Sequence, residues 1–274
     1  MAVKPKILLT NDDGIEAEGL WVLVHAIEAI AEPVIVAPMR ERSGRSHSVT
    51  VRRDMALCEV SRNGRPIGYR LDGMPADCVK LALSRLYRDE IALVVSGINW
   101  GSNLGTSILY SGTVAAAMEA ALYGVPALAV SLRDDRDAPA HYETAARVAV
   151  SLVADVLAHG LPPGVILNVN VPDLPPDEIA GTLLTRQGSE AYVDLFKTRE
   201  SPDGGKWCVN VGYERIPSKP GDHPLDDLAV IDRCVSITPL HYSMTCLSAF
   251  DSLRERIDKL SFGERGEPPS VEKT

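Results

Sequence analysis

The stretch KILLTNDDGIEAEGL, residues 6–20, places an apolar run directly before two acidic residues and a glycine. The continuous apolar run at residues 7–9 is typical of a strand that is buried on both faces, as in a parallel sheet. Asp12 and Asp13 follow it, and adjacent carboxylates repel each other unless a positive charge lies nearby. The stretch therefore predicts a parallel α/β fold with a cation at the end of its first strand.

The alternation of apolar runs and helical patterns continues through the first half of the chain. Strands are expected at 6–10, 33–37, 92–96 and 126–132, and helices at 19–30, 76–88 and 112–123, with a polar insertion after the second strand. A further helix at 142–159 ends at Gly160 before two prolines, and the strand VILNVNVPDLP follows it. This order predicts a mostly parallel sheet with helices on both faces, which binds ligands at the carboxyl ends of its strands.

Beyond about residue 180 the pattern changes. The segments GTLLTRQG, AYVDLFKT and KWCVNVGYER indicate hairpin strands, and IPSKPGDHPLDD indicates a loop or arm rich in proline and glycine. CVSITPL predicts one more strand and residues 247–260 one more helix. We therefore expect an α/β core over residues 1–180, a β-rich appendage or arm over 181–260, and a disordered tail over 261–274.

Composition excludes several classes of protein. The 274 residues are 45% hydrophobic, so the chain can bury a sizeable core. A net charge of -9 argues against a surface that binds a nucleic-acid duplex or an anionic membrane, because either partner would be repelled. Five cysteines without a C-x-x-C pair indicate free thiols in a reducing compartment. With no signal-peptide pattern and no apolar run near the roughly 18 residues of a membrane span, we expect a cytoplasmic protein.

Three loops of the first half follow expected strands, so they should gather at one edge of the sheet. The first holds Asn11, Asp12 and Asp13, the second holds Ser43 within MRERSGRSHS, and the third holds Asn99 and Asn103 within INWGSNLGTSILYSGT. Their carboxylate, hydroxyl and amide oxygens are hard donors, which suit Mg²⁺, Mn²⁺ or Ca²⁺ better than zinc or copper. A divalent ion bound among them would neutralise the acidic pair.

The third loop also has the features of a phosphate site. Its glycines recur at four-residue spacing and allow the backbone to approach a ligand closely. The helix that begins at Ser111 to Thr113 offers free N–H groups and the positive end of its dipole to an anion. Ser111 or Thr113 is also compatible with a plain helix cap.

Other catalytic motifs are absent from the sequence. Neither G-x-x-x-x-G-K-[ST] nor G-x-G-x-x-G occurs, and no G-x-S-x-G elbow presents a serine nucleophile. His47 lies close to Ser43 and Ser46, but no orienting partner for a Ser/His dyad is identifiable. The sequence therefore offers no activated nucleophile that would form a covalent enzyme intermediate.

Several unusual segments, in order from about residue 6 to residue 250, closely resemble the SurE family of survival-protein nucleotidases. They are ILLTNDDGIEAEGL, VIVAPMRERSGRSHSVT, DGMPADCVKLAL, VVSGINWGSNLGTSILYSGTVAAAMEAALYGVPALAVSL, LPPGVILNVNVPDLP, TRQG and VSITPL. The resemblance implies a Rossmann-like, mostly parallel sheet with flanking helices plus a β-rich C-terminal arm. It also implies a homodimer or homotetramer assembled through exchanged C-terminal elements. Trp100 departs from the small residue usual in the family, and Arg45 and His47 vary the second loop.

Site residues carried over from the resemblance coincide with the loops described above. The residues implied to bind one Mg²⁺ or Mn²⁺ ion per subunit are Asp12, Asp13, Ser43 and Asn99. The residues implied to surround the phosphate are Gly44, Asn103, Ser111, Gly112 and Thr113. Asp13 and Asn103 are the implied catalytic residues, although the sequence does not decide whether Asp12 or Asp13 guides the proton of the attacking water.

The resulting hypothesis is a metal-dependent phosphomonoesterase that converts nucleoside 5′-monophosphates to nucleoside and phosphate, and the sequence does not decide between 5′- and 3′-monophosphates. One alternative is a regulatory protein that binds nucleotides in the same pocket without turnover. The acidic pair disfavours that alternative, because paired carboxylates repel a phosphate unless a metal is present. Another alternative is an enzyme that acts on polyphosphate or on a different phosphate ester.

Overall fold

The computed structural model describes residues 4–62, 64–133, 140–200, 203–258 and 260. The chain divides into two compact units, residues 1–242 and residues 243–274. The first unit contains the sheet and the candidate site, and the second contains the helix α6 (Leu247–Ile257). The tail at 261–274, for which disorder was predicted, lies outside the described residues.

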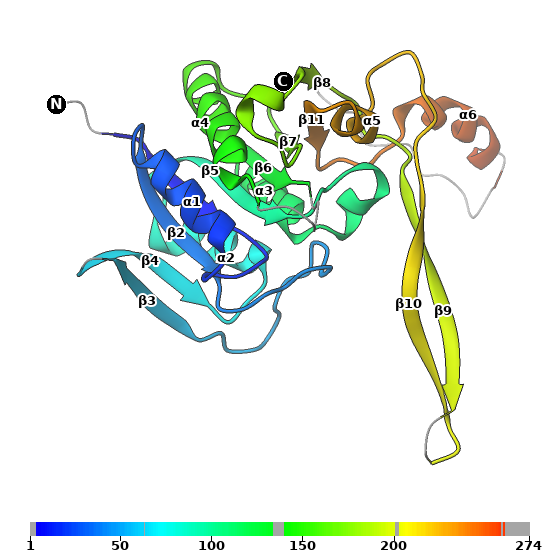
Figure 1. Cartoon of the computed structure of the whole chain (residues 1–274), viewed down its shortest axis with the longest axis horizontal. Helices are drawn as coiled ribbons and strands as arrows, with labels where there is room; N and C mark the ends of the chain where they lie inside the picture. The colour runs from blue at the N-terminus through cyan, green and yellow to red at the C-terminus, as the bar shows by residue number, and fades with distance from the viewer. Residues whose placement is uncertain (1–3, 63, 134–139, 201–202, 259, 261–274) are drawn as a thin grey trace. The chain divides into compact units, whose positions relative to one another are not determined.

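Within the described residues, the first unit is built on a nine-stranded sheet of order β3-β4-β2-β1-β5-β6-β7-β11-β8 (Figure 1). The strands are β1 (Lys6–Thr10), β2 (Glu32–Pro38), β3 (Leu57–Arg62), β4 (Arg65–Leu71), β5 (Ile91–Trp100), β6 (Ala127–Leu132), β7 (Val165–Val171), β8 (Gly181–Leu184) and β11 (Cys234–His241). Neighbouring strands from β4 to β7 are parallel, as are β11 and β8. Only β3 with β4 and β7 with β11 pair antiparallel in this described sheet. The expected mostly parallel sheet is confirmed.

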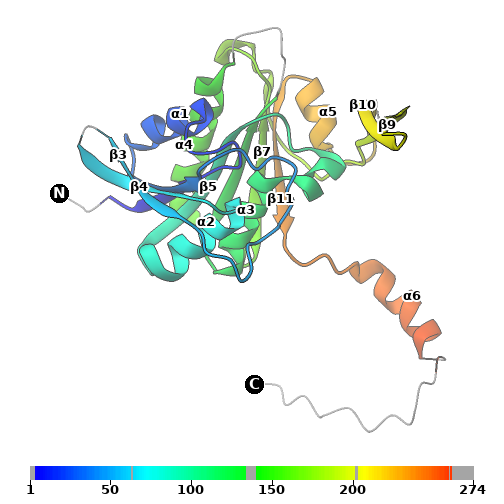
Figure 2. The same ribbon diagram turned by 90° about the horizontal axis from the view of Figure 1, so that it is seen from below.

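Helices cover both faces of the sheet, α1 and α4 on one face and α2 and α3 on the other (Figure 2). The helical segments are α1 (Glu18–Ile27), α2 (Pro75–Leu81), η1 (Ala82–Leu86), η2 (Gly105–Tyr110), α3 (Gly112–Leu122), α4 (Tyr142–His159), η3 (Pro176–Glu178) and α5 (Asp226–Ile231). Ile7 and Leu9 of β1 belong to the core beneath α1 and α4, whereas Leu8 belongs to the core beneath α2 and α3. The first strand is thus buried on both faces, as its apolar run predicted.

Three segments differ from their expected structure. The polar insertion forms β3 and β4, an antiparallel pair at the edge of the sheet, where alternating exposure obscures the apolar signal of a strand. The segment GTLLTRQG supplies β8, which pairs with β11 in the main sheet instead of joining the hairpin. The loop IPSKPGDHPLDD leads into α5. The first residues of α5, Asp226 and Asp227, are fully buried, although two adjacent acidic residues would be expected at the surface.

The expected β-rich appendage contains a second, two-stranded sheet, formed by β9 (Ala191–Glu200) and β10 (Lys206–Ile216). These strands pair antiparallel along their whole length as a long ribbon (Figure 1). Large apolar side chains on it are exposed, including Phe196 at 61% and Trp207 at 63%. A further antiparallel sheet near the C-terminus is therefore confirmed. None of the helices that the structure describes is long and apolar enough to cross a membrane.

Candidate active site

The carboxyl end of β1 meets the start of α3 at one edge of the sheet. Asp12 follows β1 and is only 4% exposed. Its Oδ1 accepts a hydrogen bond from the Thr113 hydroxyl. A Cβ atom on Gly112 would lie 2.8 Å from both the Cβ and the Oδ2 of Asp12, so the backbone of α3 approaches this carboxylate as only glycine allows. The structure therefore brings together Asp12, Gly112 and Thr113.

The two adjacent carboxyl groups are electrostatically strained. Burial raises the pKa of Asp12, although the hydrogen bond from Thr113 opposes the rise. Burial and the charge of Asp12 raise the pKa of Asp13 to about 7, against a hydrogen bond from the Trp100 N–H. That N–H donates to the Asp13 Oδ2 over 3.3 Å, which places the end of β5 beside Asp13. The pair is a concentration of buried negative charge that a cation would relieve.

Asn99 lies at the end of β5, next to the residue that contacts Asp13. Its side-chain nitrogen donates to the Gly101 carbonyl over 2.6 Å, so Oδ1 is the atom of its amide left to face a ligand. The Trp100 ring packs against Tyr142 of α4, with ring centroids 5.8 Å apart. Trp100, which departs from the small residue usual in the family, therefore packs against neighbouring protein with its ring tilted by 53° from that of Tyr142.

Asn103 is held from three sides by buried polar groups. Its Nδ2 donates to the Ser131 hydroxyl over 2.8 Å, and its backbone N–H donates to Asn170 Oδ1 over 2.8 Å. The amide groups of Asn168 and Asn170 both donate to its carbonyl oxygen. Asn168 and Asn170 were missed in the sequence, although their two-residue spacing within the strand LNVNV places both on one face.

The second loop carries Ser43 and Gly44 on the exposed side of the site. The Ser43 hydroxyl donates to Glu41 over 2.9 Å, and a Cβ atom on Gly44 would meet nothing within 4 Å. Among the described residues, no hydrogen bond joins Ser43 or Gly44 to the buried group around Asp12. These two predicted site residues therefore lie in open space beside the others.

Both sides of this loop are nevertheless anchored. The backbone N–H of Arg42 donates to the Asp12 carbonyl over 2.7 Å. On the other side of Ser43, the Ser46 N–H donates to the Tyr110 carbonyl over 3.0 Å. Ser43 therefore sits on a short span of chain between β1 and the residues that precede α3.

His47 forms a further anchor between the second loop and α3. Its Nε2 lies 2.8 Å from Oε2 of Glu119, whose side chain is 6% exposed, and Lys80 Nζ lies 3.5 Å from the other oxygen. Burial alone would raise the pKa of Glu119, but the hydrogen bond from His47 and the charge of Lys80 hold it below its ordinary value. His47 thus has a partner that the sequence did not identify, and the contact ties a loop to a helix.

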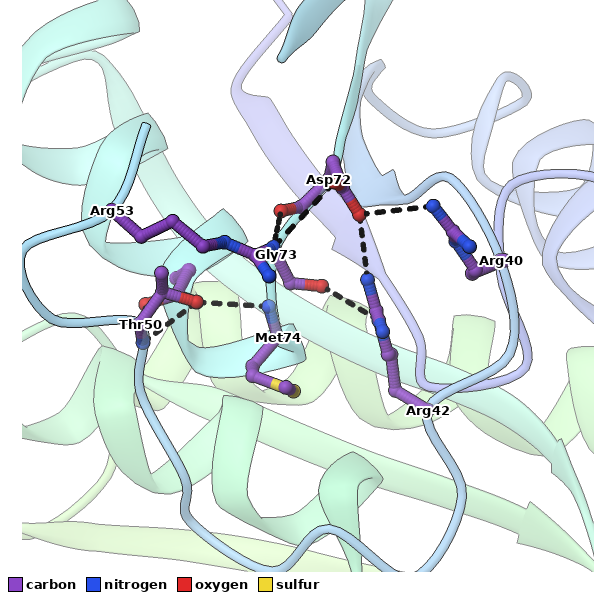
Figure 3. Close-up of polar contacts among 8 residues, drawn as sticks. Arg40, Arg42, Thr50, Arg53, Asp72, Gly73 and Met74 are labelled. Carbon is purple, nitrogen blue, oxygen red and sulfur yellow. Dashed lines mark hydrogen bonds and ion pairs between the residues drawn. The ribbon is translucent and has the colours of Figure 1, made fainter. Parts of the chain in front are cut away.

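Asp72 pairs with three arginines, Arg40 and Arg42 at the start of the second loop and Arg53 beyond its end, as Figure 3 shows. Its Oδ1 lies 2.7 Å from Arg42 Nη2 and 3.4 Å from Arg40 Nη2, and its Oδ2 lies 3.5 Å from Arg53 Nη2. Arg42 also donates through Nε to the Gly73 carbonyl. The end of β4 therefore holds the loop that carries Ser43.

Asp77 of α2 provides a second fixing point for the same loop. Its carboxylate accepts hydrogen bonds from the backbone N–H groups of Thr50, over 3.0 Å, and Met74, over 2.9 Å. The segment DGMPADC thus contributes two carboxylates, Asp72 and Asp77, that position loop backbone.

A His/Asp pair at the start of α4 was also missed from the sequence. Asp173 Oδ1 accepts from the backbone N–H of His141 over 2.7 Å and lies 2.8 Å from its Nδ1. The two residues are 32 positions apart and follow different strands, so no local pattern connects them.

The donors at this edge fit a hard divalent cation. Two carboxylates follow β1 as neighbours, Asn99 precedes the residue whose N–H donates to Asp13, and the Ser43 hydroxyl lies in the open space of the second loop. Among the described residues, no group of three or more His, Cys, Asp or Glu side chains is arranged to hold a metal ion. An ion at this position would therefore need the amide and hydroxyl oxygens as well, a set typical of Mg²⁺ or Mn²⁺.

Comparison with known proteins identifies the family and agrees with the fold. The sequence model of the family described as "Survival protein SurE" matches residues 7–194. The chain belongs to the SurE family. "5'-nucleotidase SurE" of Syntrophomonas wolfei subsp. wolfei is 40% identical over 256 residues, which cover 93% of this chain and 96% of that protein. The protein of the same name from Heliobacterium modesticaldum is 39% identical over 270 residues, which cover 97% and 98%.

A solved structure of the SurE family has the same fold. The crystal structure of the Sure protein from Aquifex aeolicus matches with a TM-score of 0.78 at 36% sequence identity, covering 93% of this chain and 100% of that chain. The resemblance to the SurE family and the expected fold class are thus confirmed.

Proposed function

We propose that this SurE-family chain is a metal-dependent phosphomonoesterase that hydrolyses nucleoside 5′-monophosphates, and also 3′-monophosphates, to nucleoside and phosphate. The observation that carries the proposal is the Asp12 carboxylate, held against the first residues of α3 beside Asp13. The name 5'-nucleotidase, borne by relatives that match nearly the whole chain, supports the reaction class. The relatives bear this name, and not that of a binding protein, which favours turnover over binding alone.

In this proposal Asp12, Asp13, Ser43 and Asn99 hold one Mg²⁺ or Mn²⁺ ion per subunit. A bound ion supplies positive charge that polarises a phosphoryl oxygen and lowers the cost of activating water. The hydroxyl of Thr113 fixes the orientation of Asp12. The Trp100 N–H does the same for Asp13.

The phosphate is assigned to Gly44, Asn103, Ser111, Gly112 and Thr113. Ser111 caps α3 by accepting a hydrogen bond from the Val114 N–H over 3.0 Å, which leaves its hydroxyl hydrogen to donate to a phosphate oxygen. The positive end of the α3 dipole acts in the same direction. Gly44, with open space around it, allows a phosphate to lie against the loop backbone.

Asp13 and Asn103 are assigned the catalytic roles. Asp13 is more exposed than Asp12, so it is the carboxylate that an attacking water reaches and whose oxygen orients the water's proton. Asn103 is immobilised by Ser131 and Asn170, which holds its side chain ready to stabilise charge on an equatorial phosphoryl oxygen.

Phosphate release tests the proposal. The substrates are nucleoside 5′- and 3′-monophosphates, ribose 5-phosphate and polyphosphate, each assayed after chelation and after addition of Mg²⁺ or Mn²⁺. We expect no release in chelator, full release with either ion, and a folded protein throughout by circular dichroism. Full activity after elemental analysis verifies metal removal would contradict the metal requirement. Absence of release from every monophosphate would contradict the reaction itself.

We further propose that the protein assembles as a homodimer or homotetramer. The β9–β10 ribbon exposes Phe196, Trp207 and Val211, a set of apolar side chains that a second copy would cover. Light scattering at micromolar concentration should give at least twice the 29.6 kDa of one chain. A monomer at that concentration would contradict assembly through this ribbon.

A further inference from the structure

The second loop carries an exposed arginine, Arg45, directly after Gly44. Its backbone is fixed, because its carbonyl oxygen accepts hydrogen bonds from the hydroxyl of Ser48 over 2.7 Å and from the N–H of Ser48 over 3.3 Å. Its guanidinium, in contrast, makes no hydrogen bond or ion pair with any residue that the structure describes. Arg45 therefore combines a fixed backbone with a positive charge that is available to a ligand.

The backbone of Arg45 lies beside the residues that precede α3. The Ser46 N–H donates to the Tyr110 carbonyl over 3.0 Å, and the Ser46 hydroxyl donates to the Leu109 carbonyl over 2.6 Å. Because Arg45 precedes Ser46 and Ser111 follows Tyr110, the first of these bonds makes Arg45 and Ser111 backbone neighbours. The arginine side chain thus begins next to a residue that is assigned to the phosphate.

The carboxylates around this loop have other partners. Asp72 is paired with three arginines, none of which is Arg45. Glu119 is paired with a histidine and a lysine, and Glu41 accepts a hydrogen bond from the Ser43 hydroxyl. Among the described contacts of residues 39–48, the charge of Arg45 is therefore one that no carboxylate neutralises.

A phosphate group that approaches this edge of the sheet needs such a charge. It meets the carboxylates of Asp12 and Asp13 on a chain of net charge -9, and both repel it. A guanidinium is planar and donates two parallel N–H bonds to phosphate oxygens. When exposed, it also attracts an anion before contact, over a range of about 8–10 Å at moderate salt. Arg45 can therefore both attract a phosphate ester and hold it.

We infer that Arg45 is a substrate-binding residue whose guanidinium attracts the phosphate group of the substrate and then contacts its oxygens. The inference rests on the proposed phosphomonoesterase function and deepens it by adding a positive side chain to the phosphate residues. Arg45 offers no oxygen to a metal ion, so the affinity for phosphate depends on it and the affinity for metal does not. It acts on the phosphate group alone, so its effect is the same for every monophosphate.

Arg45→Ala tests the inference through kinetics at low and high salt. The variant should raise the KM for a nucleoside 5′-monophosphate by roughly ten-fold, leave kcat within a few-fold, and make kcat/KM less dependent on salt. Arg45→Lys keeps the charge but not the paired N–H bonds, so its KM should be intermediate and its salt dependence that of wild type. Arg88→Ala is the matched control, since Arg88 is 76% exposed and lies before the start of β5, at the opposite edge of the sheet. It removes the same charge and should change neither quantity.

Calorimetry separates phosphate binding from turnover. Inorganic phosphate should bind the Mg²⁺-loaded Arg45→Ala protein roughly ten-fold more weakly than wild type, and Mg²⁺ titrated alone should bind both proteins equally. Unchanged phosphate binding, an unchanged salt dependence, or weaker Mg²⁺ binding by the variant would overturn the role of Arg45 and leave the hydrolase proposal intact. A wild-type protein that binds phosphate through Arg45 but hydrolyses no monophosphate would support the role of Arg45 and overturn the hydrolase proposal alone.

Discussion

The two halves of the candidate site differ in how they are held. Asp12, Gly112 and Thr113 are buried in mutual contact, and no room for a Cβ atom remains at Gly112. Ser43 and Gly44 lie in the open, with no hydrogen bond to the buried half among the described residues. Folding alone therefore assembles one half, whereas the anchors of the second loop only bring the other half close to it. Substitutions in the buried half should change catalysis, and those in the open half should change affinity.

Asp13→Asn should have the largest effect on turnover. The variant removes an anionic oxygen from the proposed metal site and from the path of the proposed attacking water, and such a loss costs roughly 10²- to 10³-fold in kcat. Because it also relieves repulsion within the acidic pair, the melting temperature without metal should stay the same or rise slightly. Asp89→Asn is the control, since the Asp89 side chain is 93% exposed beside Arg88. Near-full turnover of Asp13→Asn, or its failure to fold, would show that this carboxylate has a structural role.

Gly112→Ala tests the close packing of the buried half. The added methyl group would lie 2.8 Å from Asp12 Oδ2, so either the carboxylate or the start of α3 must move. A displacement near 1 Å costs about 10²-fold in rate. Gly181→Ala should leave the rate unchanged, because a Cβ atom there meets nothing within 4 Å. If both variants are equally active, the buried half tolerates movement and the contrast between the halves is wrong.

Ser43→Ala tests the open half. Loss of one neutral oxygen should weaken the apparent affinity for Mg²⁺ or Mn²⁺ by roughly ten-fold, with kcat at saturating metal within a few-fold of wild type. Ser48→Ala is a control from the same loop, since the Ser48 hydroxyl donates only locally, to the Arg45 carbonyl. A fall in kcat that saturating metal does not restore would contradict this prediction and would show that Ser43 acts in catalysis as well as in metal affinity.

Glu119→Gln tests an anchor of the open half and should have the smallest effect on turnover. The variant loses a charge-assisted hydrogen bond to His47, and unfolding free energy should fall by about 1–2 kcal/mol at pH 7. Since the folded-state pKa of Glu119 lies below its ordinary value of 4.5, this stability is present above pH 4.5 and is lost as pH falls through the folded-state pKa. Urea unfolding of both proteins across this range measures the difference. A difference that stays constant into acid would show that the ionised pair is not its source.

The sequence predicted best where hydrophobic pattern decides structure. The first strand and the helix Tyr142–His159 were predicted with the bounds observed, because each has an uninterrupted apolar pattern and clear ends. β3 and β4 were missed because an edge pair is exposed on alternate residues and its partner is set by the fold. α5 was missed because its buried Asp226 is stabilised by hydrogen bonds from backbone N–H groups that are distant in the sequence, and no local pattern reveals these bonds.

For the site, the sequence identified residue types and loops but not their spatial relations. The contact of Asp12 with Thr113 joins residues 101 positions apart and follows from the parallel order of β1 and β5. Asn168 and Asn170 could have been recognised from their spacing in the sequence, whereas the contact of His141 with Asp173 could not. The open position of Ser43 could not be foreseen, because it depends on where Arg42 and Ser46 are anchored.

The carboxylate of Asp226 holds backbone N–H groups from three segments of the chain. It accepts hydrogen bonds from the N–H groups of Gly105, Gly188 and Asp227, so these amides share a single acceptor group. Burial raises the pKa of Asp226, so on acidification this group is neutralised before an exposed aspartate would be. In amide hydrogen exchange, the protection factors of the three amides should then decline together, although the first and last lie more than a hundred positions apart in the chain. The three signals form a single internal probe for whether η2, the segment that precedes β9 and α5 remain joined.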